Sequence, residues 1–141
     1  MAGRLLTMST KELDRVEVVR RVVPDEADAI GAAIVELADE ARLILTTGGT
    51  GLGPRDVTPE ATAAVLDRVA PGIAEAIRAD SIAKTAHALL SRGVAGVRGR
   101  TLVVNLPGSP GGCRDGFAVL QLALHHGLEL LAGEDTVHVQ T

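Results

Sequence analysis

Residues 42–62, RLILTTGGTGLGPRDVTPEAT, combine an apolar segment, a glycine-rich turn and the start of a helix. The aliphatic and β-branched side chains of residues 42–47 suit a buried strand. The glycines that follow interrupt regular structure, and Thr58 is predicted to cap a helix that has Pro59 in its first turn. A strand, a glycine turn and a helix in this order are typical of α/β domains that bind ligands at strand ends.

Further strands and helices are predicted on both sides of this segment. Residues 16–23, VEVVRRVV, predict a strand, and a helix follows from Asp25, so that 16–23 and 42–47 form a βαβ unit with a right-handed crossover. The other predicted elements are helices at 71–82 and 114–132, an irregular helical segment at 84–90, strands at 94–97 and 101–106 joined as a hairpin, and a tail at 134–141 that is loose or an edge strand. The sequence therefore predicts one domain over residues 1–141, with three α/β/α layers, a mostly parallel sheet and one short hairpin.

Composition limits the partners that this chain is expected to bind. The sequence has one aromatic residue, Phe117, a net charge of −4 and scattered basic residues, so we do not expect a nucleic-acid partner. Cys113 is the only cysteine, which excludes an internal disulfide. Since we find neither an apolar run of membrane-spanning length nor a secretion signal, we expect no membrane partner and a cytoplasmic location.

A second glycine-rich turn, PGSPGG at 107–112, follows the predicted strand 101–106. Both turns are expected at the carboxyl edge of the sheet, facing one cleft. The closely spaced amides of residues 48–51 suit a phosphate group. A plain chain reversal is the alternative, but three glycines, three threonines and Asp56 exceed what a reversal needs. The pattern GxxxxGK[ST] does not occur, which argues against a P-loop.

At this point a resemblance to a known family becomes specific. The stretch TTGGTGLGPRDVTPEAT at 46–62 resembles the signature of the MogA/MoaB family of molybdopterin adenylyltransferases, which includes the pterin-binding domain of gephyrin. VVPDE at 22–26, AKTAHALLSRGVAGVRG at 83–99 and NLPGSPGG at 105–112 resemble family segments in the family's order. The related CinA-type and MoeA-type domains have other glycine patterns in the first turn. The resemblance implies adenylylation of molybdopterin with ATP and Mg²⁺ in a homo-oligomer, a trimer.

The resemblance also implies roles for individual residues. Asp25 and Asp56 match the family's functional acidic positions and are expected to be catalytic, with Asp56 at the magnesium ion. The residues expected to bind ATP or the pterin are Thr47, Gly48, Gly49, Thr50, Gly51, Ser91, Arg92, Pro107, Gly108, Ser109 and Pro110. Three alternatives stay open: a helix cap for Asp25, a closed turn for Asp56, and a solvated surface position for Arg92.

Histidine and cysteine give no further candidate site. His87, His125, His126 and His138 do not form a metal-ligand spacing with Cys113 and are expected to be structural or exposed. A position at a helix start could lower the pKa of the Cys113 thiol, but the sequence places no base beside it, so we do not expect a nucleophile.

The N-terminal residues depart from the family pattern. The resemblance implies a first strand that ends in a Ser-Asp-Arg type turn, which this sequence lacks. Residues 1–15 are predicted to align with the end of the first helix, with RLLTMST at 4–10 as an alternative shortened strand. We expect either a start codon placed too far downstream, which we favour, or a reduced member with impaired nucleotide binding. The second case would make the chain a non-catalytic pterin-binding or scaffold module.

Overall fold

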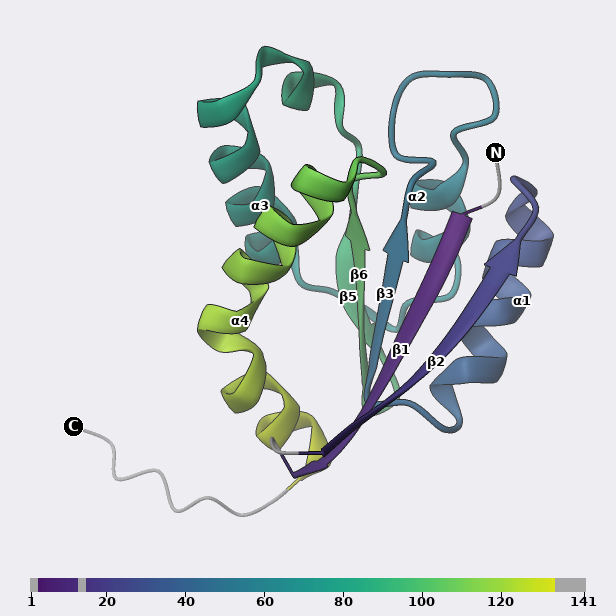
Figure 1. Cartoon of the computed structure of the whole chain (residues 1–141). Coiled ribbons are helices and arrows are strands. Elements are labelled where there is room, and N and C mark those ends of the chain that lie inside the picture. The colour runs from purple at the N-terminus through teal and green to yellow at the C-terminus, as the bar shows by residue number, and fades with distance from the viewer. Residues whose placement is uncertain (1–2, 13–14, 134–141) are drawn as a thin grey trace.

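The computed structural model describes residues 3–12 and 15–133 (Figure 1). Within these ranges the chain forms a six-stranded sheet with helices on both faces. In chain order the elements are β1 Gly3–Glu12, β2 Arg15–Val23, α1 Ala27–Ala38, β3 Leu43–Thr47, α2 Thr58–Ala63, β4 Arg68–Val69, α3 Pro71–Lys84, the 3₁₀ helix η1 Ala86–Leu90, β5 Ala95–Arg98, β6 Thr101–Leu106 and α4 Pro110–Ala132.

The helices form the two outer layers that the sequence predicts. Helices α1 and α2 cover one face of the sheet, and α3 and α4 cover the other (Figure 1). Alternating side chains of β3 point to opposite faces of the sheet. Ile44 packs in the hydrophobic cluster under α1, whereas Leu43 and Leu45 pack in the hydrophobic cluster under α4. Because both faces of β3 and β6 are covered, these two central strands are buried, except for Thr47 at the end of β3. The three-layer α/β/α architecture is thus confirmed.

The sheet is mixed, so the predicted mostly parallel sheet is wrong. Its strand order is β2-β1-β3-β6-β5-β4, and among the strand pairs of the described residues only β3 and β6 are parallel. Strands β2 and β3 run in the same direction because each is antiparallel to β1. The α1 crossover therefore spans an inserted strand, and 16–23 and 42–47 are not neighbours.

Strand β1 corrects the interpretation of residues 1–15 as the end of a helix. Residues 3–12 pair with β2 from Gly3 opposite Val23 to Glu12 opposite Arg15, and with β3 from Arg4 opposite Thr47 to Met8 opposite Leu43. The short connection to β2 makes an antiparallel hairpin the natural pairing. The alternative of a strand at 4–10 was the better one, because pairing on both edges overrides the weak local preference of this segment.

Smaller differences concern individual element boundaries. The helix after the first turn has Val57, not Thr58, at its N-cap, although Pro59 lies in the first turn as predicted. Helix α4 begins at Pro110, four residues before the predicted 114. The β5–β6 hairpin is confirmed, with Arg98 opposite Thr101, and the short edge strand β4 was not predicted.

Two points concern the limits of the described chain. The predicted tail at 134–141 lies outside the described residues. Within the described ranges, no helix has the combination of length and apolar character that crossing a membrane requires.

Candidate functional site

The two glycine-rich turns meet at one edge of the sheet. They follow β3 and β6, which are parallel neighbours with Thr47 opposite Leu106. The amide of Gly48 donates to the carbonyl oxygen of Leu106 at 3.3 Å. A Cβ atom on Gly108 would lie 3.1 Å from the Cα atom of Gly48, so the backbones of the two turns approach more closely than most side chains allow. The predicted meeting of the turns is confirmed.

The turn after β3 depends on glycine at two consecutive positions. Gly48 and Gly49 have φ angles of +88° and +68°, in the left-handed region that glycine adopts without strain. A Cβ atom on Gly49 would lie 2.3 Å from Oγ1 of Thr58, and the amide of Thr58 donates to the carbonyl of Gly49 at 3.2 Å. The turn is therefore packed against the start of α2.

Asp56 closes the far end of the same turn. Its Oδ2 atom accepts a hydrogen bond from the amide of Gly53 at 2.9 Å, and its own amide donates to the carbonyl of Gly53 at 3.0 Å. A Cβ atom on Gly51 or on Gly53 would lie 2.9 Å from Oδ2, so both glycines make room for the carboxylate. Turn closure, one of the alternatives for Asp56, is observed, and it occupies one carboxylate oxygen.

The turn after β6 is short and locally capped. Ser109 is the N-cap of α4, and its Oγ atom accepts a hydrogen bond from the amide of Gly112 at 3.1 Å. Pro110 lies in the first turn of the helix, where a missing N–H costs nothing. This turn therefore directs the N-terminus of a 23-residue helix toward the site, which favours negative charge nearby.

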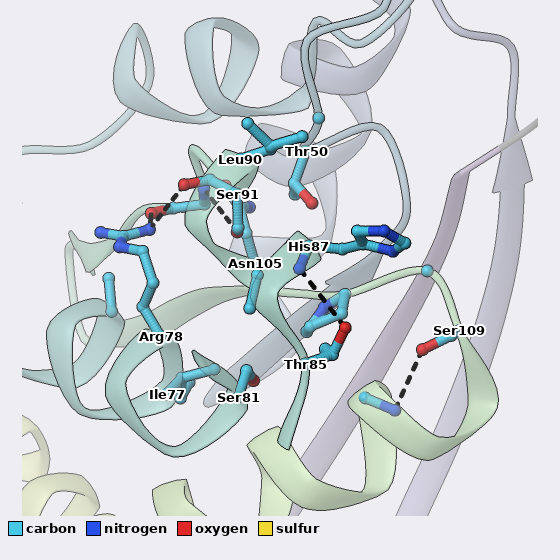
Figure 2. Close-up of a pocket in the computed structure, with 17 residues that line it drawn as sticks. Thr50, Ile77, Arg78, Ser81, Thr85, His87, Leu90, Ser91, Asn105 and Ser109 are labelled. Carbon is cyan, nitrogen blue, oxygen red and sulfur yellow. Dashed lines mark hydrogen bonds between the residues drawn. The ribbon is translucent and has the colours of Figure 1, made fainter. Parts of the chain in front are cut away.

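A cavity of about 280 Å³ lies beside the two turns (Figure 2). Its walls come from the turn after β3, the inner side of α3 with η1, the end of β6 and the start of α4. The lining residues are Thr50, Gly51, Ala74, Ile77, Arg78, Ser81, Thr85, His87, Ala88, Leu90, Ser91, Gly93, Asn105, Pro107, Gly108, Ser109 and Gly112. None of these described lining residues is acidic, so the cavity suits a neutral or anionic ligand with both apolar and polar surface.

The structure brings together some of the predicted binding residues but not all of them. Those that line the cavity are Thr50, Gly51, Ser91, Pro107, Gly108 and Ser109. Thr47, Gly48, Gly49, Arg92, Pro110, Asp25 and Asp56 are not among the lining residues. Asp25 follows β2 at the same edge of the sheet, but β1 lies between β2 and β3 and separates it from the turns. The part of the site nearest the cavity is therefore built from the two turns and the segment around Ser91.

The wall formed by α3 and η1 was not predicted as part of the site. It contributes Ile77, Ser81, Thr85 and His87 to the cavity (Figure 2). The Oγ atom of Ser81 is buried and has no hydrogen-bond partner among the described residues, which leaves it available to a ligand or a water. His87 is exposed, as expected, and lines the cavity as well. The resemblance of residues 83–99 was the one sequence signal for this wall.

Buried hydrogen bonds tie together the strands that carry the turns. The Nδ2 atom of Asn105 donates to Oγ1 of Thr46 at 2.8 Å and to Oγ1 of Thr62 at 3.0 Å. Its Oδ1 atom accepts from the amide of Val94 at 3.1 Å. Asn105 on β6 thus links β3, α2 and the segment before β5 directly beneath the cavity.

The structure bears on two further predictions, one about metal ligands and one about the pKa of the Cys113 thiol. Within the described residues, no three His, Cys, Asp or Glu side chains come together as a metal site. Burial raises the pKa of the Cys113 thiol, against a smaller opposite effect of Arg114. The suggestion of a lowered thiol pKa at the helix start is therefore wrong, because desolvation outweighs the nearby positive charge.

Fold and site together define an α/β domain with a cavity where two neighbouring parallel strands end. Residues 3–126 match the family described as probable molybdopterin binding domain. The chain belongs to this family, which includes molybdopterin adenylyltransferases and the MoaB and Mog proteins.

Several relatives resemble the chain over most of its length. It is 37% identical over 123 residues to a molybdopterin adenylyltransferase of Helicobacter pylori, a match that covers 86% of this chain and 70% of the relative. It is 44% identical over 121 residues to the molybdenum cofactor synthesis protein cinnamon of Drosophila melanogaster, covering 84% of this chain but only 20% of that protein. The chain thus spans about a fifth of the cinnamon protein.

Solved structures agree with the fold. The crystal structure of MoaB from Thermus thermophilus has a TM-score of 0.73 and 53% identity, covering 79% of this chain and 71% of the other. The Mog protein from Mycobacterium ulcerans has a TM-score of 0.70 and 52% identity, covering 72% of this chain and 68% of the other.

Proposed function

We propose that the chain is an enzyme of molybdenum cofactor biosynthesis that adenylylates molybdopterin with Mg-ATP. The observation that carries the proposal is the close contact of Gly48 with Gly108 beside a cavity that no acidic side chain lines among the described residues. Two turns that present amides to one cavity suit a reaction between two phosphorylated ligands. The names of the relatives, among them the adenylyltransferase of Helicobacter pylori, support the same reaction.

In the proposed reaction, a terminal phosphate oxygen of molybdopterin attacks the α-phosphorus of ATP. A new P–O bond forms as the bond from the α-phosphorus to the bridging oxygen breaks, and pyrophosphate leaves. The chain has to hold two anions in line and to offset their charge, which is most of the catalytic task in such transfers. The amides of residues 49–51 and the N-terminus of α4 supply donors and partial positive charge for this purpose, since the amide of Gly48 already donates to Leu106.

The proposed binding residues divide between the two turns. Thr47, Gly48, Gly49, Thr50 and Gly51 hold phosphate groups, and Pro107, Gly108, Ser109 and Pro110 flank the adenine or the pterin ring. Ser91 lies in the cavity wall as well. The apolar side chains of Ile77 and Leu90 give a flat ring a surface to pack on.

Asp56 fits a magnesium ion that is held partly by substrate. Only its Oδ2 atom accepts a hydrogen bond from the described residues, which leaves Oδ1 for a cation. Mg²⁺ usually keeps several waters and binds through one or two carboxylates together with substrate phosphates. The ion would offset the charge of the phosphates. Asp25 is the second acidic residue that the resemblance implies, although β1 separates it from the turns.

The proposal is tested with purified chain, ATP, Mg²⁺ and molybdopterin, by following pyrophosphate release and the adenylated pterin. Asp56→Asn should reduce turnover by about a hundredfold or more while leaving the fold intact. Asp67→Asn is the matched control, because Asp67 also accepts a backbone amide, from Gly99 at 2.6 Å, in the β5–β6 hairpin. No turnover by the intact chain, or equal losses in both variants, would contradict the proposal.

A second candidate is a domain that binds the pterin without consuming ATP. The direction of β1 favours it: β1 is antiparallel to β3, so its carboxyl end lies at the edge of the sheet opposite the turns. The chain's first strand therefore brings no polar turn to the cavity. Calorimetry with each ligand separates the candidates, since this one requires molybdopterin binding without consumption of ATP.

The chain is proposed to act as a trimer in the cytoplasm. Two leucines on the outer face of α4, Leu122 at 88% and Leu130 at 53% exposure, support burial against other copies. A single cysteine and the use of ATP are in keeping with a reducing, ATP-containing compartment. Sedimentation equilibrium tests the trimer directly, and a monomer at micromolar concentration would exclude it.

A further inference from the structure

The guanidinium group of Arg92 reaches across to the turn after β3. Its Nε atom donates to the carbonyl oxygen of Gly51 at 2.8 Å, and its Nη2 atom donates to the carbonyl oxygen of Asp56 at 2.6 Å. Its Nη1 atom donates to both carboxylate oxygens of Glu60, at 3.0 Å for Oε2. All three nitrogens of one side chain are thus engaged by the turn and by the helix that follows it.

Hydrogen bonds to the turn after β3 and to α3 also hold the backbone around Arg92. Its amide donates to the carbonyl oxygen of Thr50 at 2.8 Å. On the other side, Nη1 of Arg78 in α3 donates to the carbonyl oxygens of Ser91 and Gly93, each at 3.2 Å (Figure 2). The segment 91–93 is therefore attached to α3 by one arginine and holds the turn with another.

We propose that Arg92 is a positioning residue that holds the turn 50–56 in its ligand-binding shape, and does not itself bind phosphate. Arg92 is not among the residues that line the cavity, whereas Thr50 and Gly51, which it holds, are. A guanidinium group presents donors on three nitrogens of a rigid planar fork and reaches acceptors that lie apart, whereas the three donors of lysine all lie on one nitrogen. The consequence for ligand binding rests on the proposed function, but the effect on the turn does not.

This role explains why so open a turn keeps one conformation. Four of the six residues 48–53 are glycines, and glycine has the largest conformational freedom to lose on folding. An exposed ion pair alone would contribute little, and Glu60 has about half of its side chain exposed. The two hydrogen bonds to backbone carbonyls fix the chain at Gly51 and at Asp56, near both ends of the turn.

Hydrogen exchange of the full chain tests the effect on the turn without any ligand. In Arg92→Lys, the amides of Asp56 and Thr58 should exchange about tenfold faster or more, while amides of the β5–β6 hairpin stay unchanged. Glu60→Gln should give a smaller acceleration at the same amides. Arg100→Lys, in the exposed turn of the hairpin, is the control and should change neither group of amides. Unchanged exchange at Asp56 and Thr58 in Arg92→Lys would overturn the proposal.

Binding of Mg-ATP, measured by calorimetry on the same variants, separates positioning from direct contact. If Arg92 acts through the turn, both Arg92→Lys and Glu60→Gln should weaken binding, because Glu60 does not line the cavity and its carboxylate accepts from Arg92. If Arg92 contacts phosphate itself, Glu60→Gln would leave binding unchanged or strengthen it, and the proposal fails. Failure of the unaltered chain to bind Mg-ATP would reject the proposed function, and the exchange experiment would still decide the role of Arg92.

Discussion

The turn after β3 and the turn after β6 lie side by side at one edge of the sheet, but they are held in different ways. The turn after β6 is short, contains Pro107 and Pro110, and is capped by Ser109, which accepts a bond from Gly112 three residues away. The turn after β3 is longer, and contacts from Arg92 hold it, 41 residues from Gly51 in the sequence. The turn after β6 is fixed by its own residues, whereas the turn after β3 has local bonds at Asp56 and further bonds from a distant part of the fold.

The difference shows that a binding loop can be rigid without local stiffness. Prolines and a cap restrict the second turn even before the fold forms. The first turn has its own hydrogen bonds between Gly53 and Asp56, but its other contacts come from α2, the segment 91–93 and β6. We therefore expect changes in the first turn to affect the whole domain and changes in the second to stay local.

The largest effect is expected for Gly49→Ala. The new Cβ atom would meet the buried side chain of Thr58 at 2.3 Å, and alanine is strained at a φ of +68°. Together these costs should lower the free energy of unfolding by about 2–4 kcal/mol, measured by urea denaturation. Gly111→Ala is the control, because a Cβ atom there meets nothing within 4 Å. Equal effects of the two substitutions would show that the first turn has room to adjust.

The second largest loss of stability is expected from removing the hydrogen bonds beneath both turns. Asn105→Ala removes two buried bonds and one part-buried bond, and it leaves the hydroxyls of Thr46 and Thr62 and the amide of Val94 without this partner. We expect a loss of about 2–3 kcal/mol in the free energy of unfolding, because unsatisfied buried groups bear their full desolvation cost. A loss below about 0.5 kcal/mol would mean that β3 and β6 are aligned without this side chain.

A smaller and more local effect is expected for Ser109→Ala. Loss of the cap should cost about 1 kcal/mol of unfolding free energy and should speed amide exchange in the first turn of α4. Ser109→Asp keeps an acceptor for the amide of Gly112 and should restore most of the stability. Faster exchange around Gly49 in Ser109→Ala would refute the expectation that the second turn is held independently.

The smallest effect is expected on the pKa of the Glu60 carboxyl. The hydrogen bond from Arg92 lowers the pKa of the Glu60 carboxyl, and desolvation opposes this in part. Because the folded-state pKa is lowered, ionised Glu60 stabilises the fold above the ordinary glutamate pKa. This contribution to stability is lost as the pH falls through the lowered pKa. Carbon NMR titration of Glu60 should show a higher pKa in Arg92→Gln than in the unaltered chain. The same pKa in both proteins would contradict the role of this contact.

The helices, strands and turns that neighbouring residues specify could mostly be predicted from the sequence. Helix α1, strands β3 and β6, the β5–β6 hairpin and both glycine turns have periodicity or turn residues that can be recognised without the fold. The meeting of the turns followed from the rule that parallel strands end at the same edge. These features needed only short-range information.

Features that depend on distant partners could not be predicted. Strand β1 exists because β2 and β3 pair with it, and its own residues carry no clear signal. The acceptors of Arg92 lie 32 to 41 residues away, so nothing near Arg92 indicated its contacts. The wall of α3 and η1 was missed for the same reason, since Ile77 and Ser81 face the cavity only when α3 packs beside the turns.

The central claim, that both turns serve one cavity, is tested most directly by an NMR titration with molybdopterin that follows backbone amides. The account predicts that residues 48–51 and residues 108–112 shift together and yield a single Kd. Shifts confined to one of the turns, or different Kd values for the two, would contradict it.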